Sequence, residues 1–345
     1  MPDLMSMTKP QLVAAMEAMG EKKFRAMQLY DWFHKKLVND YDEMTNLSAA
    51  LRSKLKEEYE IPALSIAKRW ISKVDGTQKF LFECYDGNLI ESVLMRYKYG
   101  NSVCISSQAG CRMGCRFCAS TLDGLARNLS ASEMLGQVYE IQKATGERVS
   151  HVVVMGSGEP FDNYDALIDF ITLLTSEEGL NISQRNITVS TCGLVPKIYE
   201  FADLKLGVTL AISLHSPTDE MRRELMPIAN RYSIEEILAA CRYFTETTGR
   251  RVTFEYSLVK GQNDAKEHAE ILARLLKGML CHVNLIPVNP IKERDYVQSD
   301  RENVEKFKNI LEKKSIDVTI RREMGRDIAA ACGQLRRDFK QGGSK

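Results

Sequence analysis

The chain has 345 residues, with 47 lysines and arginines against 46 aspartates and glutamates, so its formal net charge is +1. This length allows one large domain with an appendage, and the balanced charge provides no overall field that would indicate a nucleic-acid partner. No window reaches the roughly 18 consecutive apolar residues of a membrane span, and the N-terminus lacks an apolar signal segment. We therefore expect a cytoplasmic protein whose nine cysteines bind metal, perform redox chemistry or are simply buried, rather than forming structural disulfides.

Residues 1–60 predict a helical accessory domain. The segment "TKPQLVAAMEAMG" has a threonine cap, a proline near the start of the helix and a glycine at its end. The segments "KFRAMQLYDWFHKKLV" and "LSAALRSKLKEEY" continue with apolar residues at helical spacing. Residues 61–100 contain "TQKFLFECYDGNLIESVLMRY", in which β-branched and aromatic residues flank an Asp-Gly turn. That pattern predicts a linking β-hairpin.

The rhythm of the sequence changes over residues 101–335. Six short apolar segments predict strands: "SVCISS", "HVVVMGSG", "NITVSTCG", "GVTLAISLHS", "VTFEYSLVKG" and "HVNLIPVNP". Amphipathic helical stretches lie between them: "ASEMLGQVYEIQKAT", "NYDALIDFITLL", "SIEEILAACRYFTETT" and "DAKEHAEILARLL". This alternation predicts an α/β fold with a parallel sheet, either curled or open. By composition, the tail of residues 336–345 is expected to be flexible.

Polar or glycine residues follow nearly every predicted strand: Gly158 with Glu159, Ser190, Ser213 with His215, and Asn289. Active sites of β/α barrels gather at this carboxyl edge of the strands. Each residue alone could simply begin a polar loop, and His215 could be a hydrogen-bonded core histidine. Their recurrence at strand ends, together with a cysteine loop after the first strand, favours a functional site.

The cysteine loop is "SSQAGCRMGCRFCAS", with Cys111, Cys115 and Cys118 separated by three and two residues. Three thiolates on a short loop can hold three irons of a [4Fe–4S] cluster and leave the fourth iron open to a substrate. Zinc is the competing metal, but its structural sites have four closed ligands, usually as two pairs. Cys104 lies seven residues upstream, so a four-cysteine zinc site stays open at this point.

The form "CRMGCRFC" is typical of radical S-adenosylmethionine enzymes, and the likeness continues through "VVMGSGEP", "TVSTCG", "AISLHSP", "RELMPI", "HVNLIPVNP" and "DIAAACGQL". Together these segments resemble the RlmN/Cfr family of RNA methyltransferases over nearly the whole chain. The resemblance implies a partial (β/α)₆ barrel over residues 101–335 that ends in a catalytic segment, preceded by an accessory domain that resembles the family's RNA-binding domain.

The resemblance also implies the cofactors. Cys111, Cys115 and Cys118 would bind a [4Fe–4S] cluster, and two molecules of S-adenosyl-L-methionine would be consumed per turnover, as methyl donor and as radical source. The implied contacts with S-adenosylmethionine are Gly158, Glu159, Ser190, Ser213, Leu214, His215 and Asn289. A reductant such as flavodoxin would supply the electron.

The implied reaction is methylation of adenosine at C2 in 23S rRNA, at the peptidyl-transferase region, and in tRNA, at the adenosine 3′ of the anticodon. Cys332 would carry the methyl group, Glu91 would accept the C2 proton, and Cys104 would form a disulfide with Cys332 that a thiol reductant must reset. Cys332 could instead be a buried apolar side chain, and Glu91 a solvent-facing strand residue. Two alternative functions stay open: C8 methylation of adenine in 23S rRNA, and a noncatalytic zinc-dependent RNA-binding protein.

The remaining cysteines, Cys84, Cys192, Cys241 and Cys281, lie in apolar patterns, and no function is assigned to them. Two positions depart from the family pattern: Ala329, where an aspartate is common, and Cys192, where serine or threonine is common. Local positive charge offers modest support for an RNA partner, because residues 321–345 hold seven basic and three acidic residues and Arg112, Arg116 and Arg127 lie near the cysteine loop.

Overall fold

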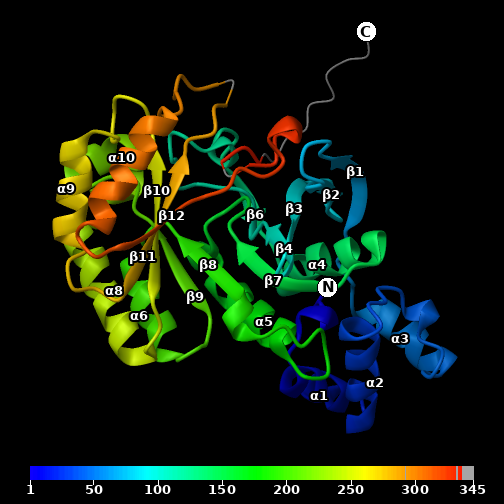
Figure 1. The fold of residues 1–345 in the computed structure, drawn as a ribbon. Helices are drawn as coiled ribbons and strands as arrows, with labels where there is room; N and C mark the ends of the chain where they lie inside the picture. Colours follow the sequence, from blue (N-terminus) through cyan, green and yellow to red (C-terminus); the bar gives the residue numbers. More distant parts are fainter. Residues whose placement is uncertain (292, 332, 336–345) are drawn as a thin grey trace.

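The computed structural model describes residues 1–291, 293–331 and 333–335, and three helices open the chain (Figure 1). They are α1 (Lys9–Ala18), α2 (Lys23–His34) and α3 (Ala49–Glu58), as the sequence predicts. Thr8 and Gln11 form a capping box around the first turn of α1, and the Ser48 hydroxyl accepts the Leu51 amide at the start of α3. These side chains take up amides that the first helical turn leaves without backbone partners.

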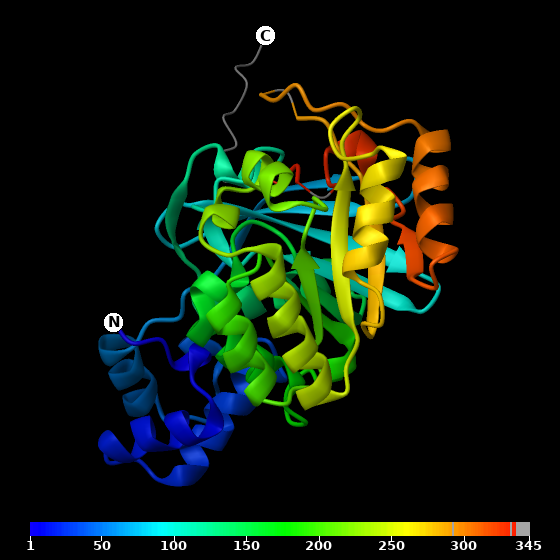
Figure 2. The ribbon, with the colours of Figure 1, turned by 90° about the vertical axis from the view of Figure 1, so that its left-hand side faces the viewer.

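The helices α1 to α3 gather at one end of the molecule, beside α4 (Ala131–Thr145) and α5 (Tyr164–Thr175) (Figures 1 and 2). Their apolar faces, which include Leu12, Leu29 and Phe33, belong to the same buried cluster as the core of the barrel. One buried hydrogen bond crosses this boundary, between the Tyr139 hydroxyl of α4 and Nδ1 of His34 in α2, at 2.9 Å.

A single ten-stranded sheet forms the centre of the fold, in the order β1-β2-β3-β4-β7-β8-β9-β10-β11-β12. The strands are β1 (Ser65–Ile71), β2 (Gln78–Glu83), β3 (Leu89–Tyr97), β4 (Gly100–Ile105), β7 (Val149–Val154), β8 (Ile187–Thr191), β9 (Thr209–Ser213), β10 (Val252–Leu258), β11 (Cys281–Pro287) and β12 (Asp317–Ile320). The predicted hairpin is confirmed as β2 and β3, and the six predicted parallel strands are β4 and β7 to β11.

Two features of the sheet were not predicted. Strands β1 and β12 extend it at opposite edges, and the strands β1 to β4 pair antiparallel, so the hairpin continues directly into the parallel sheet. Because the two edge strands do not pair with each other, the barrel is open. This is the partial α/β barrel that the resemblance implies, with one additional parallel strand.

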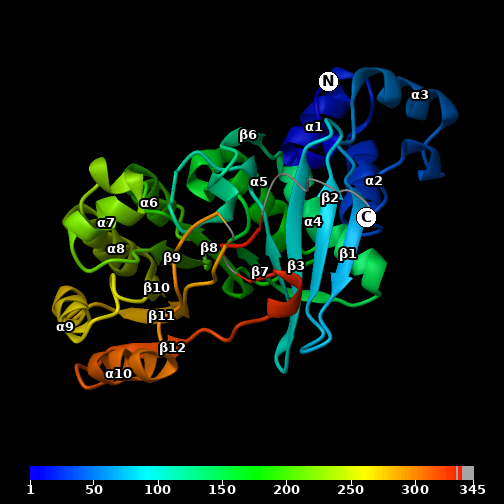
Figure 3. The same cartoon turned by 90° about the horizontal axis from the view of Figure 1, so that it is seen from above.

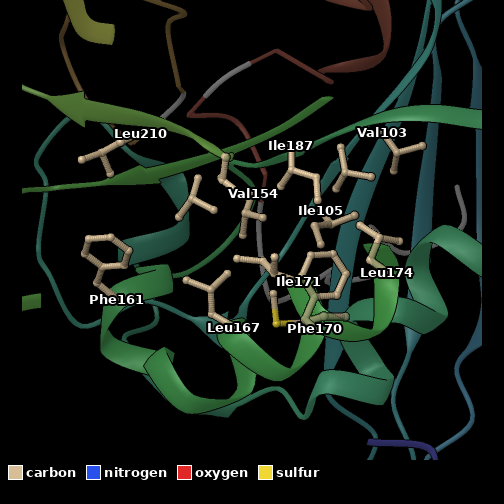
Figure 4. Close-up of a cluster of buried hydrophobic side chains, with 14 of the residues drawn as sticks. Val103, Ile105, Val154, Phe161, Leu167, Phe170, Ile171, Leu174, Ile187 and Leu210 are labelled. Atoms are coloured by element: carbon tan, nitrogen blue, oxygen red, sulfur yellow. The ribbon is translucent and has the colours of Figure 1, made fainter. Parts of the chain in front are cut away.

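Helices α4, α5, α6 (Val195–Asp203), α8 (Ile234–Thr248), α9 (Lys266–Leu275) and α10 (Arg301–Glu312) cover the outside of the parallel strands, and the short helix α7 (Asp219–Leu225) follows β9 (Figures 1 and 3). Figure 4 shows the core between the sheet and α5, where Val103, Ile105, Val154 and Ile187 meet Phe170 and Ile171. Gly146 and Gly249 end α4 and α8 in the left-handed conformation that glycine adopts readily.

After β12 the chain crosses back over the antiparallel strands, as Figure 3 shows from above. This C-terminal segment, residues 324–335 apart from position 332, is held to the loop between β1 and β2: Ser72 donates to Asp327 at 2.7 Å, and the Gly325 amide donates to Asp75 at 3.0 Å. It is also held beside the cysteine loop, where Ala119 donates to the Gly333 carbonyl at 2.8 Å. Among the described residues, no helix has the length and apolar character required to span a membrane.

Candidate active site

The three predicted cluster ligands, Cys111, Cys115 and Cys118, line one cavity at the carboxyl ends of the parallel strands. They lie on the loop between β5 (Gln108–Gly110) and β6 (Leu125–Asn128), which pair with each other. The Thr121 hydroxyl lies 3.0 Å from the Cys115 carbonyl and 2.9 Å from the Cys118 carbonyl, which folds the loop back on itself. The empty space of the cavity, including the part open to solvent, is about 950 Å³.

The donor set fits a cluster better than a single zinc ion. Within the described part of the chain, no three His, Cys, Asp or Glu side chains come close enough to hold one metal ion. A cubane spreads its thiolates over separate irons, whereas zinc draws all its ligands to one centre. Burial raises the pKa of the Cys111 thiol to about 12 and raises that of Cys115 well above its usual range. Both thiols are therefore protonated without iron, and ligation must displace their protons.

A buried cation lies next to the wall of this cavity, beside Cys192. Arg222 of α7 is fully buried, donates from Nη2 to the Cys192 carbonyl at 2.6 Å and from Nε to the Leu214 carbonyl at 3.2 Å. Its Nη1 finds no hydrogen-bond partner among the described residues. Buried charges normally have a counter-charge, and a cluster with three thiolates is an anionic group that suits this position.

Six of the seven predicted S-adenosylmethionine contacts line the same cavity: Gly158, Glu159, Ser190, Ser213, His215 and Asn289. The Ser190 and Ser213 hydroxyls lie 3.4 Å apart at the ends of β8 and β9. Leu214 does not line this cavity; its side chain is buried in the core, its amide donates to Glu255 and its carbonyl accepts Arg222. The geometry therefore gathers the strand-end residues and leaves Leu214 outside the group.

Glu159 is fixed by the backbone around it. Its carboxylate accepts the Cys192 amide at 2.7 Å and the Phe161 amide at 3.1 Å, and burial raises the pKa of this carboxyl. Its own amide donates to the Gln108 side chain at 2.8 Å. Glu159 thus ties the loop after β7 both to the loop after β8, through Cys192, and to strand β5, through Gln108.

His215 is buried and lines the cavity, so the two readings of this residue, core histidine and site residue, are compatible. Its Nδ1 accepts the Ser257 amide at 2.9 Å, which leaves the proton on Nε2. Burial lowers the pKa of His215 to about 3, so the ring is neutral at physiological pH. The Phe117 ring packs edge-on against it, with centroids 4.8 Å apart.

A second cavity adjoins the first and contains Cys104. The two cavities share Met155, Ile286, Asn289 and Arg321 in their walls. Cys104 is buried on β4, where it pairs in register with Val93 of β3. The C-terminal segment covers this face, because Met324, Ala330 and Leu335 pack with Val93, Met95 and Cys104.

Cys332 lies outside the described residues. Its sequence neighbours, however, are placed: Ala331 lines the second cavity and Gly333 lines the first. The structure records no disulfide between two of the described cysteines, and the pairing of Cys104 with Cys332 stays a prediction.

Glu91 is buried on β3, unlike the solvent-facing strand residue that was the alternative. It forms an ion pair with Lys79 of β2, at 2.9 Å between Oε1 and Nζ. Side chains alternate along a strand, so Glu91 shares the face of Val93 and Met95, which line the second cavity.

The cavity also contains residues that sequence reasoning missed. Glu255 of β10 is buried, accepts Asn284 at 3.0 Å and pairs with Arg321 at 3.5 Å. Cys192, which was assigned no function, lines the cavity as well. The signal for Glu255 was a carboxylate inside the apolar run "VTFEYSL", while Cys192 follows directly on the strand end marked by Ser190.

Known proteins with similar sequences agree with the chemistry of this site. Residues 2–61 match the ribosomal RNA large subunit methyltransferase N-terminal domain, and residues 105–275 match the radical SAM superfamily. A protein of Lachnospira eligens named "Probable dual-specificity RNA methyltransferase RlmN" is 66% identical over 99% of this chain and 97% of its own. A protein of the same name from Lachnoclostridium phytofermentans is 60% identical over 98% of this chain and 95% of its own.

The chain belongs to the RlmN family of RNA methyltransferases. A crystal structure of a radical SAM methyltransferase from Sphaerobacter thermophilus shares the fold, with a TM-score of 0.93 and 44% identity over 98% of this chain and 100% of that one. As a member of the RlmN family, the chain is a radical S-adenosylmethionine methyltransferase whose cofactors are a [4Fe–4S] cluster and S-adenosylmethionine.

The expected positive charge beside the cluster loop is weaker in the structure than in the sequence of this RlmN-family chain. Arg112 pairs with Asp162, and Arg127 pairs with Asp86 and with Glu133. Arg116 is exposed on the loop between Cys115 and Phe117. Two of the three arginines are therefore already neutralised by carboxylates of the chain itself.

Proposed function

We propose that the chain methylates adenosine at C2 in both 23S rRNA and tRNA, with Cys332 as the methyl carrier. The RlmN-family relatives carry the words "dual-specificity RNA methyltransferase" in their names, which supports two classes of RNA substrate. Residues 1–60 are proposed as an RNA-binding accessory domain, residues 61–100 as its link, and residues 101–335 as the catalytic barrel.

The observation that carries the proposal is the pair of adjoining cavities. Cys104 lines the second cavity, and the two sequence neighbours of Cys332 line one cavity each. A methyl carrier has to reach S-adenosylmethionine in the first cavity and the RNA base in the second. A segment that runs along the boundary between them suits both tasks.

The chemistry of adenine explains why a carrier is needed. C2 is an electron-poor carbon with no lone pair to attack a methyl sulfonium, so direct polar transfer has no nucleophile. Held by Cys111, Cys115 and Cys118, a [4Fe–4S] cluster would supply one-electron chemistry: the electron that releases a hydrogen-abstracting radical from S-adenosylmethionine, and an acceptor for the electron that the base adduct loses.

The proposed roles of the chain's own residues follow in order. The Cys332 thiolate accepts a methyl group, and after loss of one hydrogen atom the methylene carbon forms a bond to C2. Glu91 accepts the proton from C2. The Cys104 thiolate then attacks the sulfur of Cys332, a disulfide forms, and the carbon–sulfur bond breaks toward the carbon, which gains a proton and becomes the methyl group. External thiols reduce the disulfide.

The proposed cofactor contacts fit these roles. Gly158 and Glu159, Ser190, Ser213 and neutral His215 would hold S-adenosylmethionine beside the open iron, with Asn289 at the boundary to the second cavity. A flavodoxin-like protein would deliver the electron. An adenosine inside a stacked helix cannot enter the second cavity, so the enzyme requires a loop or an unstacked base.

The test is nucleoside mass spectrometry of 23S rRNA and tRNA after anaerobic reaction with reconstituted enzyme, S-adenosylmethionine and a reductant. We expect 2-methyladenosine in both RNAs with the wild type and none with Cys332→Ala. Cys84→Ala is the matched control, because Cys84 is a buried thiol that lines neither cavity, and it should retain activity.

Other outcomes discriminate between the proposals. Formation of 8-methyladenosine would support the methyl-carrier mechanism, but it would show that C8 of adenine, and not C2, is methylated. An iron-loaded enzyme that modifies neither carbon would contradict the proposal, and so would full activity of Cys332→Ala.

A further inference from the structure

A row of side chains crosses four strands of the sheet on the face that the C-terminal segment covers. The register pairs Trp70 of β1 with Lys79 of β2, and Lys79 in turn with Val93 of β3. Val93 then pairs with Cys104 of β4. Cross-strand partners point to the same face of a sheet. Lys79 is thus two strands from Cys104 on the face that forms the second cavity.

Lys79 is the one cation of this row, and it is nearly buried, with 9% of its side chain exposed. Its ammonium lies 2.9 Å from Oε1 of Glu91, 3.2 Å from the carbonyl of Ala329, and 4.8 Å from the centre of the Trp70 ring. Three directions around one nitrogen are therefore occupied by a carboxylate, a peptide carbonyl and an aromatic face.

The carbonyl contact is unusual because it joins distant parts of the chain. Ala329 is 250 residues away from Lys79 in sequence and only three residues before Cys332. One ammonium group therefore touches both the side chain proposed to accept the C2 proton and the backbone of the segment that bears the proposed methyl carrier.

We propose that Lys79 is a positioning residue of the methylation reaction: it holds Glu91 as an oriented carboxylate and fixes that carboxylate relative to the segment that carries Cys332. The inference rests on the proposed function, in which Glu91 is the base. Burying a charge is costly unless an opposite charge lies close to it, so loss of the Lys79 ammonium, 2.9 Å from Oε1, would disturb the orientation of the buried Glu91 carboxylate.

The ion pair alone would also be compatible with a purely structural role. Two facts favour the positioning role. The pair lies beside a cavity rather than inside the closed core, since Glu91 shares its strand face with Val93 and Met95 of the cavity wall. The segment that Lys79 contacts also has other anchors, at Ser72 and Asp75, so the structure does not require Lys79 to hold it down.

The experiment compares the full-length, cluster-loaded wild type with Lys79→Met, Lys79→Arg, Glu91→Gln and Lys68→Met. Three quantities are measured: methylation of Cys332 without RNA, by peptide mass spectrometry; 2-methyladenosine formed in one turnover; and RNA covalently held on the protein, by denaturing gel. Lys68→Met is the matched control, because exposed Lys68 lies over the same Trp70 ring, at 5.0 Å, and makes no ion pair with Glu91 among the described contacts.

For Lys79→Met we expect normal methylation of Cys332, a loss of 2-methyladenosine of at least about tenfold, and accumulation of the covalent RNA adduct that waits for its proton to be removed. Glu91→Gln should give the same pattern. Lys79→Arg, which keeps the charge, should recover most of the product, and Lys68→Met should match the wild type.

The inference is overturned if Lys79→Met forms product at the wild-type rate, if methylation of Cys332 and product fall together without adduct, or if Glu91→Gln is active while Lys79→Met is not. If Lys79→Met does not fold, Glu91→Gln and Lys79→Arg decide: adduct in Glu91→Gln together with product in Lys79→Arg supports the inference, and loss of Cys332 methylation in Lys79→Arg contradicts it. A wild type that forms no 2-methyladenosine overturns the proposed function itself, which separates that failure from failure of the inference alone.

Discussion

At Gly158 the main chain passes so close to the start of strand β5 that a methyl group does not fit. A Cβ at this position would lie 2.6 Å from Cβ of Gln108, and the backbone has a φ of +107°, which side chains rarely adopt. Gln108 in turn accepts the Glu159 amide at 2.8 Å and donates to Asp162 at 3.0 Å. One glycine therefore sets the spacing between the loop after β7 and strand β5, beside the cavity.

Replacing Gly158 with alanine should combine backbone strain with a steric clash and destabilise the protein by about 3 kcal/mol. Gly249→Ala is the matched control: it also has a positive φ, but nothing lies within 4 Å of the added carbon, so we expect a loss of only about 1 kcal/mol. Urea unfolding of both variants measures the difference. Equal losses would show that the contact with Gln108 is unimportant, and the Gly158→Ala protein should also bind S-adenosylmethionine more weakly by calorimetry.

Residues that carry a compact motif could be predicted from sequence, whereas residues that act through distant contacts could not. Cys111, Cys115 and Cys118 stand on one loop, so their spacing alone indicates a shared site. Glu255 and Arg321 line the same cavity but come from β10 and from the chain after β12, and only the folded sheet brings them to within 3.5 Å. The role of Lys79 could not be predicted for the same reason, because its partner Ala329 is 250 residues away in the sequence.

At the scale of elements, the N-terminal helices are joined to the barrel by a neutral histidine. His34 of α2 is fully buried, burial lowers its pKa to about 3, and its Nε2 has no partner among the described residues. The ring accepts or donates at Nδ1 to Tyr139 of α4. A charged imidazolium would therefore place its Nε2 proton where no acceptor lies among the described residues.

The docking of α2 should weaken in acid. The folded pKa of His34 lies below its unfolded value of 6.5, so between about pH 6.5 and pH 3 the unfolded state binds more protons, and stability falls as pH falls. From pH 7 to pH 5 the expected loss is about 2 kcal/mol. Urea unfolding followed by the fluorescence of Trp32, in a Trp70→Phe background, measures it. In His34→Gln this part of the pH dependence should disappear; an unchanged dependence would point to other groups.

Elements with regular patterns were predicted and elements at the sheet edges were missed. The central strands are apolar and buried, as in "HVVV" and "LAIS", which predicts them directly. Strand β1 is exposed along most of its length and has no alternating pattern, so it depends on pairing with β2. Strand β12 is only four residues long, and it too is defined by its neighbour, β11. Edge strands of this kind owe their existence to tertiary contacts that a local pattern does not contain.

At the scale of the whole molecule, the cluster loop and the fold are largely independent. The three cluster cysteines lie within eight residues of one loop, and they do not link distant parts of the chain. The main apolar core runs from the N-terminal helices through the barrel without them, although Cys115 packs against the small cluster of Cys192, Leu225 and Met226.

Removal of the iron should therefore leave the fold intact. Anaerobically purified protein should contain about four iron atoms per chain and be brown, and Cys115→Ala should lose the colour. After chelation of the iron, the far-ultraviolet circular dichroism spectrum should overlay that of the loaded protein. Zinc in place of iron would revive the zinc alternative, and collapse of the spectrum would show that the cluster organises the barrel.

The C-terminal segment that closes over the antiparallel strands has a consequence for biosynthesis. A ribosome releases the cysteine loop some two hundred residues before Gly333 and Leu335, whose carbonyls are bound by Ala119 and Ser120 beside that loop. During that interval the thiols of the cysteine loop are not yet covered by the C-terminal segment. Iron and sulfide can therefore reach the cysteine loop before residues 333–335 have been synthesised and packed beside it.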